Sequence, residues 1–326
     1  MDTTINHQAD MTDLDPRPSA DLPKRRRSKW AKIRKDYWLY ILLLPGLAYF
    51  IIFKYLPMWG IVIAFQDFSP FLGVLKSNWV GVKHFVNFFN NPDFVRLLRN
   101  TLILGFYDLV FFFPAPIIAA LLLNEIRVGI FKRAVQTMIY VPHFISMVIV
   151  ASMTYVFLTT NGGVVNEIIH ELTGQRINFL ADPAWFRPLI ILQIMWKETG
   201  WGTIIFLAAL ASVDVEQYEA AIVDGASRFQ RLWHITLPAI SSTIVILLIL
   251  RLGNFLDTGF EQIFLMTNSL NRTVADVFDT YVYQVGIRQG AFSYSTAVGL
   301  FKSVVGIILI YGSNYFAKKF GHEGII

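Results

Sequence analysis

The segment EAAIVDGASRFQRLWHITLPAI, Glu219–Ile240, lies between two long apolar runs and decides which fold the chain is expected to adopt. Glu216–Val223 predicts a short helix in which the small side chains of Ala220 and Ala221 are neighbours. Gly225 follows as a C-terminal cap, because glycine adopts a positive φ without steric cost. The small side chains would allow a partner surface to approach this helix closely.

The second half of the segment predicts an amphipathic helix over Arg228–Ile235, followed by Pro238 at the start of the next apolar run. An ordinary loop between two helices, with a good helix former and a glycine stop, would share these features. The tripeptide Glu-Ala-Ala alone is therefore a weak signal. The spacing of the whole segment between two apolar runs is what carries the interpretation.

The composition places the chain in a membrane. Of its 326 residues, 55% are hydrophobic and only 16% are charged, which is little charge for a soluble domain. The chain has no Cys, which excludes disulfides, thiolate metal sites and thiol nucleophiles. His143 and His170 belong to no spacing that would hold a metal, so we expect no metal site and interpret both as structural.

Six stretches reach the length of about 20 apolar residues that crosses a bilayer. Lys54 and Pro57 interrupt the first stretch, which is therefore either long and kinked or shorter than its apolar run. A small interfacial helix is expected around His84–Phe89, after the first span. The six predicted spans are Tyr37–Ala64, Thr101–Leu123, Val135–Phe157, Leu189–Ser212, Ile240–Phe264 and Ala297–Phe316.

The basic segment Lys24–Lys35 directly before the first span predicts a cytoplasmic N-terminus, because positive charge favours that side of the membrane. Nucleic acid could also bind such a run, but its place beside an apolar span favours the membrane, and we expect no nucleic-acid partner. Residues 1–35 are predicted to form a polar, disordered tail, retained because the next apolar run is too long for a cleavable signal peptide. Residues 36–318 would hold the six spans, with residues 213–238 as a cytoplasmic loop, and residues 319–326 would form a cytoplasmic C-terminal tail.

The full spacing of this loop, E-A-A, then Gly, then I-x-L-P, resembles the EAA loop of binding-protein-dependent ABC importer permeases. Three further segments, KYLPMWGIVIAFQDF (Lys54–Phe68), FKRAVQTMIYVPHFIS (Phe131–Ser146) and DTYVYQVGIRQGAFSYSTAVGLFKSV (Asp279–Val304), are similar to the polysaccharide and oligosaccharide branch of this family, and among these to alginate-importer permeases. The resemblance implies an all-α membrane protein of about six transmembrane helices with type I ABC importer permease architecture.

In that family the short helix of the EAA loop inserts into a cleft on the ATP-binding subunit and transmits its closure to the membrane helices. The first residues of the loop would form this docking helix and its turn, and the last two would fix the start of the fifth span. By position, the ATPase-coupling residues implied by the resemblance are Glu219, Ala220, Ala221, Asp224, Gly225, Leu237 and Pro238.

The resemblance also implies the partners. The chain contains no G-x-x-x-x-G-K-[ST] phosphate loop, so ATP and Mg²⁺ are expected on separate ATP-binding subunits and no cofactor on this chain. The family pairs two homologous permease chains with a dimer of ATP-binding subunits and an extracytoplasmic sugar-binding protein. We therefore expect a multi-pass subunit in the bacterial inner membrane, not itself an enzyme, that imports oligosaccharides, in particular acidic ones such as those derived from alginate, by alternating access.

Polar side chains inside the predicted spans are the candidate substrate pathway, because an ionisable group at bilayer depth costs about 2.5–3.5 kcal/mol and needs a partner or a function. In the fifth span they recur every three or four residues and are predicted to share one helical face. Aromatic rings beside hydrogen-bonding groups suit sugars, and the cations would attract the carboxylates of a uronate cargo. The candidates are Lys197, Trp201, Arg251, Asn254, Asp257, Glu261 and Lys302.

Other interpretations stay open at this point. The same charges could form structural pairs, such as Arg251 with Asp257 or Glu261, and Lys197 with Glu198. A secondary transporter driven by an ion gradient would have more spans, inverted repeats and broken helices, and would leave the EAA loop without a role. An intramembrane enzyme would need a paired acid, a nucleophile or a metal, for which the nearby carboxylates of the fifth span are the one faint candidate.

Overall fold

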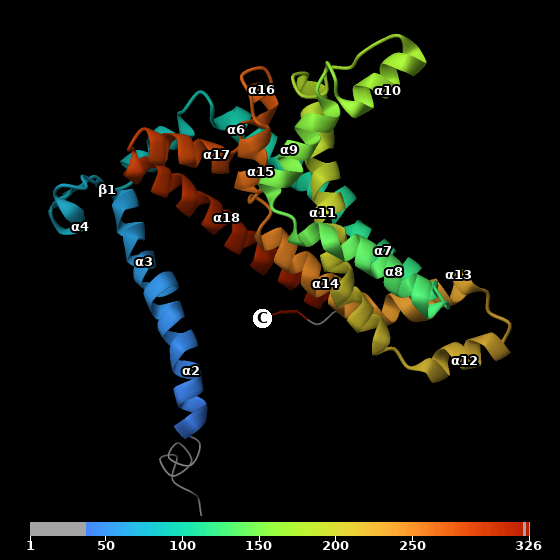
Figure 1. Cartoon of the computed structure of the whole chain (residues 1–326). Coiled ribbons are helices and arrows are strands. Elements are labelled where there is room, and N and C mark those ends of the chain that lie inside the picture. The colour runs from blue at the N-terminus through green and yellow to red at the C-terminus, as the bar shows by residue number, and fades with distance from the viewer. Residues whose placement is uncertain (1–36, 322–323, 326) are drawn as a thin grey trace, which may run out of the picture. The chain divides into compact units, whose positions relative to one another are not determined.

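Helices form most of the described chain, because a segment in a lipid environment satisfies its backbone hydrogen bonds by coiling on itself. The structure, a computed structural model, describes residues 37–321 and 324–325 (Figure 1). The predicted N-terminal tail, residues 1–35, lies outside the described residues, as do residues 322, 323 and 326 of the predicted C-terminal tail. The chain divides between Trp59 and Gly60 into two units.

The first unit carries the start of the first apolar span. It contains α2 (Tyr37–Phe50), a π-helical turn (Ile51–Tyr55) and α3 (Leu56–Met58). A 3₁₀-helical segment, Trp59–Phe65, follows, and the helices over Tyr37–Phe65 together are long and apolar enough to cross a membrane. The predicted span Tyr37–Ala64 is thus confirmed as one apolar helical stretch.

The second unit begins with a small folded segment before its first long helix. Strand β1 (Gln66–Asp67) pairs antiparallel with β2 (Asn78–Trp79), and α4 (Gly73–Lys76) lies between them in the sequence. The predicted helix around His84–Phe89 is present as α5 (Lys83–Phe89). Its Phe88 ring is buried and meets the rings of Phe94, Phe278 and Phe301 at centroid distances of 5.0–5.7 Å, which fixes α5 against α6, α17 and α18.

Four long helical stretches qualify as membrane spans by length and composition, and six do if each of two bent helix pairs counts as one span. In the spans at Phe94–Glu125, Arg228–Gly253 and Phe292–Lys319, only 17% of the most apolar window is buried within the chain, so lipid or partner chains must cover the rest. The long helices of the second unit are α6 (Phe94–Tyr107), the π-helical turn Asp108–Phe112, α7 (Pro114–Glu125), α11 (Pro183–Ala211), α14 (Leu237–Gly253) and α18 (Phe292–Lys319).

The third predicted span, Val135–Phe157, is wrong as a single helix. The chain forms α8 (Gly129–Tyr140) with a 3₁₀-helical turn (Val141–Phe144), then bends by 101° into α9 (Met147–Leu158). Pro142 in the turn has no N–H to donate, and Ser146 starts the next helix by accepting a hydrogen bond at Oγ from the Ile149 amide, at 3.4 Å. His143 lies in the 3₁₀-helical turn directly before this bend.

The fifth predicted span, Ile240–Phe264, is also wrong as a single helix. Helix α14 ends at Gly253, residues 254–259 form a turn and an extended stretch, and Gly259 adopts φ +82° before α15 (Phe260–Met266). In α15, Gln262 is buried and donates Nε2 to the Ile190 carbonyl at 2.7 Å and to Gln193 Oε1 at 2.9 Å. These hydrogen bonds satisfy the buried Gln262 side chain and hold α15 against α11.

The remaining short helices connect these elements at the two ends of the second unit. Figure 1 shows α10 (Val164–Thr173) and α16 (Arg272–Ala275) at one end of that unit, and α12 (Val215–Val223) with α13 (Arg228–Arg231) at the other. Helix α17 (Phe278–Val282) and the π-helical turn Tyr283–Arg288 lead to α18. Asn100 of α6 is fully buried and donates to the carbonyls of Thr273 and Asp276, both at 3.0 Å, so it fixes α16 to α6.

Glycine sets the distance between α14 and α18. A Cβ atom at Gly306 would lie 2.6 Å from the Gly253 carbonyl oxygen, which is backbone and cannot move aside alone. Small residues at such crossings let two helices approach closely inside a membrane. Gly299, on the same helix, has open space around the position of a Cβ atom.

We expect Gly306→Ala to destabilise the protein, by the order of 1–3 kcal/mol found for overpacking. Gly299→Ala is the matched control and should be neutral or slightly stabilising, because alanine favours a helix by about 0.5–1 kcal/mol. The measurement is the midpoint of thermal unfolding of the protein purified in detergent. Equal midpoints for the two variants would contradict the close crossing.

Candidate functional site

The first half of the EAA segment forms the predicted short helix, α12 (Val215–Val223). In α12, Asp214 Oδ1 caps the N-terminus by accepting from the Glu216 amide at 2.9 Å. The helix ends in a Schellman motif, in which the Gly225 amide donates to the Ile222 carbonyl at 3.0 Å and the Ala226 amide to the Ala221 carbonyl at 2.8 Å. Gly225 has φ +78°, so the predicted glycine cap is confirmed.

Helix α12 presents a small, partly apolar surface. Glu219 and Ala220 are exposed, Ala221 is half-buried, and Asp224 and Gly225 are exposed. Ile222 and Val223 at its C-terminal end are 56% and 87% exposed. Exposed apolar side chains on a short helix at one end of the unit indicate a surface that another chain covers.

The second half of the EAA segment differs from the prediction. Helix α13 starts at a capping box of Ser227 and Gln230 and continues through a π-helical turn, Leu232–Thr236, into α14. Leu237 and Pro238 therefore lie inside one continuous helix, Arg228–Gly253, and do not start a separate one. The π turn supplies the reason, because its extra residue accommodates a proline that cannot donate to the preceding turn.

A side chain that the sequence interpretation missed connects α12 to this helix. The Tyr218 hydroxyl lies 2.9 Å from Thr236 Oγ1, at the π turn, and Thr236 is buried. Arg228 at the start of α13 lies 3.8 Å from Glu125 at the end of α7, with both side chains largely exposed. The tyrosine contact attaches the exposed helix α12 to the base of α14 directly.

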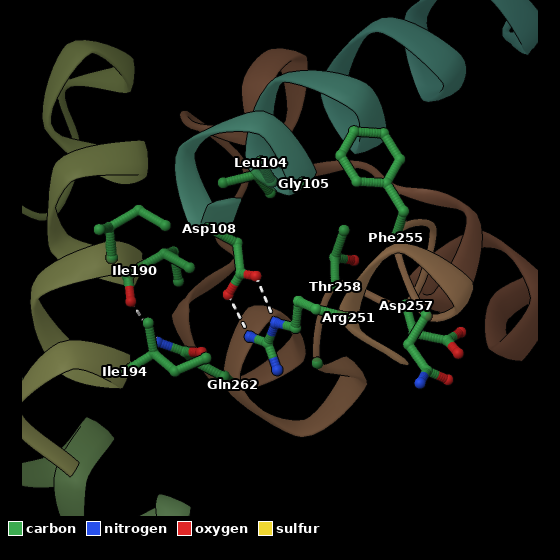
Figure 2. Close-up of a pocket in the computed structure, with 13 residues that line it drawn as sticks. Leu104, Gly105, Asp108, Ile190, Ile194, Arg251, Phe255, Asp257, Thr258 and Gln262 are labelled. Carbon is green, nitrogen blue, oxygen red and sulfur yellow. Dashed lines mark hydrogen bonds and ion pairs between the residues drawn. The ribbon is translucent and has the colours of Figure 1, made fainter. Parts of the chain in front are cut away.

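The centre of the second unit holds a half-buried ion pair. Arg251 of α14 forms a bidentate pair with Asp108, which begins the π-helical turn between α6 and α7, as Figure 2 shows. The Arg251 guanidinium also lies over the Phe112 ring, 4.8 Å from its centroid. The sequence interpretation missed Asp108, although a lone carboxylate in the middle of the second apolar run was a signal for it.

This pair lines a cavity of about 170 Å³, which we call the central cavity. Its walls are α6 and α11 on the apolar side, and residues 254–259 and α15 on the polar side. Gly105 of α6 allows a close approach here, since a Cβ atom would lie 2.7 Å from the Phe255 carbonyl. Figure 2 shows the residues that line the central cavity, among them Leu104, Asp108, Ile194, Arg251, Thr258 and Gln262.

Lys302 of α18 forms ion pairs with two carboxylates. Its Nζ donates to Asp257 Oδ1 at 2.6 Å and also to Asp279 Oδ1. Asp279 in turn accepts at Oδ2 from the Thr258 amide at 3.1 Å. Lys302 therefore joins α17 and α18 to the broken segment after α14, and its side chain is only 11% exposed.

Lys197 and Trp201 belong to a separate cluster at the bend between α8 and α9. Lys197 Nζ donates to Glu198 Oε1 at 2.6 Å and to the His143 carbonyl at 2.9 Å. The His143 ring lies 2.7 Å from Glu198 Oε2 at Nδ1 and stacks on Trp201 at 4.4 Å. The predicted structural pair of Lys197 with Glu198 is thus present.

The predicted stripe on one face of the fifth span is wrong, because the helix ends at Gly253. Only Arg251 is in α14, Asn254 and Asp257 lie in the turn, and Glu261 is exposed on α15. The predicted pairs of Arg251 with Asp257 or Glu261 are not formed, since Asp108 takes that position. Among the described residues, no three His, Cys, Asp or Glu side chains gather as metal ligands would.

Apolar helices that can cross a bilayer, ion pairs inside their bundle and an exposed helix at one end together define a membrane permease subunit. The chain belongs to the family of binding-protein-dependent transport system inner membrane components, which matches residues 112–322. It is 68% identical to protein LplB of Bacillus subtilis, across 90% of this chain and 93% of that protein. It is 57% identical to the polygalacturonan/rhamnogalacturonan transport system permease protein YteP of Bacillus subtilis, across 93% and 94% of the two chains.

The fold is that of solved ABC importers. A crystal structure of a bacterial alginate ABC transporter, in complex with alginate pentasaccharide-bound periplasmic protein, contains a chain that superimposes with a TM-score of 0.83 at 40% identity, covering 91% of this chain and 99% of that chain. A crystal structure of a bacterial ABC transporter involved in the import of the acidic polysaccharide alginate gives a TM-score of 0.81 at 41% identity, covering 89% and 98%. The predicted type I permease fold is thereby confirmed.

We expect Asp108→Asn and Arg251→Gln each to destabilise the protein by about 1 kcal/mol, because each leaves a half-buried charged partner without its ion pair. The double variant Asp108→Leu/Arg251→Met should recover much of the loss, since apolar replacement of both partners of an ion pair inside a helix bundle is often neutral. Thermal unfolding midpoints in lipid nanodiscs measure this.

Glu125→Gln is the control, because its pair with Arg228 is exposed and should change stability by no more than about 0.5 kcal/mol. A double variant as unstable as the sum of the single ones would contradict the pairing of Asp108 with Arg251.

Proposed function

We propose that this chain is one of two permease subunits of an ATP-driven importer that moves acidic oligosaccharides across the bacterial inner membrane. The sequence identity to relatives over about nine-tenths of the chain supports this class of transporter. The exposed helix α12 is the single feature that supports the coupling of transport to ATP hydrolysis. The N-terminus and C-terminus lie in the cytoplasm in this proposal, on the same side as α12.

The proposed cargo follows from the chemistry of the relatives. One relative is named for polygalacturonan and rhamnogalacturonan, and the superimposed crystal structures are of alginate transporters. Both groups of polymers contain uronic acids, whose carboxylates are ionised at neutral pH. Identity to the polygalacturonan permease, 57%, exceeds the 40–41% to the alginate transporter chains, which favours galacturonate-containing oligosaccharides over alginate-derived ones.

Helix α12 is proposed to dock into a cleft of a separate ATP-binding subunit, which holds ATP and Mg²⁺. Ala220 and Ala221 keep the helix thin enough for close approach, and Ile222 and Val223 supply apolar contact. When the two ATP-binding subunits close, they move α12, and the contact of Tyr218 with Thr236 passes that motion to the base of α14.

Transport then follows alternating access. An extracytoplasmic sugar-binding protein delivers the oligosaccharide to the outer ends of two homologous permease chains. Movement of α14 displaces Arg251 relative to Asp108, because the two residues lie on different helices of the bundle. Breaking and remaking such an internal pair separates two arrangements of the bundle, which is the two-state element that coupling between distant sites requires.

We expect Gly225→Val to uncouple ATP hydrolysis from uptake. Gly225 has φ +78°, a conformation that costs a β-branched residue on the order of 1–2 kcal/mol, so the helix end that meets the ATP-binding subunit must change. Gly225→Asn should retain most of the coupling, because asparagine tolerates this conformation. The measurement is the ratio of uptake to ATP hydrolysis in proteoliposomes of the whole transporter.

Gly174→Val is the matched control for this strain. Gly174 caps α10 with φ +72° at the opposite end of the second unit, and, like Gly225, it has open space around a Cβ position. It should leave the uptake ratio unchanged. Normal coupling in Gly225→Val, or equal uncoupling in both variants, would contradict the docking role of α12.

The cargo proposal predicts which sugar stimulates the transporter. Galacturonate oligosaccharides bound to the partner binding protein should increase ATP hydrolysis by the reconstituted complex above the rate with the empty binding protein. Their carboxyl-reduced counterparts, which are galactose oligosaccharides, should give little increase, and alginate oligosaccharides form the third arm. Stimulation by the neutral sugar equal to that by the acidic one would contradict an acidic cargo.

A further inference from the structure

The cations of the predicted pathway are already neutralised inside the chain. Arg251 is paired with Asp108, Lys302 with Asp257 and Asp279, and Lys197 with Glu198. A carboxylate on an acidic cargo therefore meets no uncompensated cation among these three groups. If this chain recognises acidic charge, the recognition has to occur at another place in the chain.

A larger cavity, of about 630 Å³, lies at the end of the second unit opposite α12, and we call it the outer cavity. It is formed by the start of α6, the end of α15, α16, α17 and the π-helical turn before α18. Its volume is within the range of about 300–1,000 Å³ typical of sites for small molecules. The proposed orientation places it on the extracytoplasmic side, where the cargo arrives.

The outer cavity is positively charged. Three arginines, Arg96, Arg272 and Arg288, face two carboxylates, Asp93 and Asp276. Arg96 Nη2 binds Asp93 Oδ1 at 3.0 Å and Asp276 Oδ2 at 3.3 Å, and Arg272 Nε lies 3.5 Å from Asp276 Oδ1. Arg288 forms no ion pair within residues 37–321 and 324–325 and is exposed. The guanidinium fork of an arginine matches a carboxylate in shape and charge.

Its other lining groups suit a sugar ring. Phe264 is 43% exposed and its ring is held by Phe260, stacked at 5.3 Å, and by the edge of Tyr283 at 5.3 Å. The amide side chains of Gln284 and Gln289 also line the cavity. A supported aromatic face beside amide and hydroxyl groups is the arrangement in which C–H faces of a sugar pack and its hydroxyls find hydrogen bonds.

The cavity wall is fixed before any ligand binds. Asn268 donates Nδ2 to the Leu180 carbonyl at 2.8 Å, and Asn100 holds the backbone of α16 at two carbonyls. Tyr281 accepts a hydrogen bond from Asn91 Nδ2 at 2.7 Å, and burial raises the pKa of its hydroxyl above the ordinary value, so the hydroxyl stays protonated. Preorganised groups lose little entropy on binding.

We propose that the outer cavity binds one carboxylate-bearing sugar unit of the imported oligosaccharide before it enters the bundle. Arg288 binds the carboxylate. Arg272 contributes a second guanidinium, because Asp276 is shared between Arg272 and Arg96 and the three arginines exceed the two carboxylates by one charge. The Phe264 ring packs against the sugar. The carboxylate comes from the sugar and not from an acidic side chain of the binding protein, because the site is concave and carries an aromatic face. This inference rests on the proposed acidic cargo.

The test is uptake by proteoliposomes of the whole transporter, driven by its binding protein, with galacturonate oligosaccharides and their carboxyl-reduced galactose counterparts. Arg288→Gln and Arg272→Gln should each raise the half-saturating concentration for the acidic sugar about tenfold, the effect of one charge-assisted hydrogen bond. They should leave any neutral-sugar uptake unchanged, and Arg288→Lys should fall between Arg288→Gln and wild type.

Arg176→Gln is the matched control. Arg176 lies at the same end of the unit but outside the cavity, paired with Glu167 at 2.9 Å. It should leave the half-saturating concentration unchanged. Co-purification of each variant with its partner subunits shows that the transporter assembles, and basal ATP hydrolysis of Arg176→Gln should equal that of wild type.

Three outcomes would overturn the site. Acidic uptake that is insensitive to both substitutions would refute it while leaving the proposed function intact. Weaker docking of the empty binding protein to Arg288→Gln or Arg272→Gln would assign the arginines to protein carboxylates instead. Uptake of neutral but not acidic sugars by the wild-type complex would refute the proposed function, and this site with it.

Discussion

The structure depends on one constraint, which is that polar groups surrounded by apolar helices must be satisfied within the bundle. The bidentate pair of Asp108 with Arg251 shows how the chain meets it, because each half-buried side chain supplies the counter-charge of the other. Lys302 with Asp257 and Asp279, and Lys197 with Glu198, repeat the solution at two other places. The pairs of Arg251 and of Lys302 join elements distant in the sequence, and Lys197 does so through its bond to the His143 carbonyl, so these contacts fix the packing.

The same constraint decides where helices break. The non-helical backbone of residues 254–259 lies where Asp279 can accept from the Thr258 amide, and Gln262 holds α15 against α11. The bend between α8 and α9 lies where Lys197 can donate to the His143 carbonyl. Non-helical backbone at this depth is stable because protein groups replace water as hydrogen-bond partners. Irregular segments and ion pairs therefore occur together.

A mechanical connection follows from the continuity of α13 and α14. The helix Arg228–Gly253 contains 26 residues, which gives a length of about 39 Å at about 1.5 Å per residue. Tyr218 contacts it near one end through Thr236, and Arg251 lies at the other end beside the central cavity. In the proposed mechanism, one rigid element spans the distance between the docking helix and the internal ion pair, and the π turn is the place where it can change its winding.

The sequence by itself determined the apolar spans, the helix α12 and its glycine cap, because these features depend on local composition and on the φ angles that glycine adopts. It also determined that the chain is a permease, since the spacing of the EAA segment lies within one continuous stretch. It could not show that Ile240–Phe264 breaks or that Arg251 pairs with Asp108, 143 positions away in the sequence. Those outcomes required tertiary structure, because the partner that satisfies a buried charge, and the three arginines that meet at the outer cavity, come from helices that are brought together only by folding.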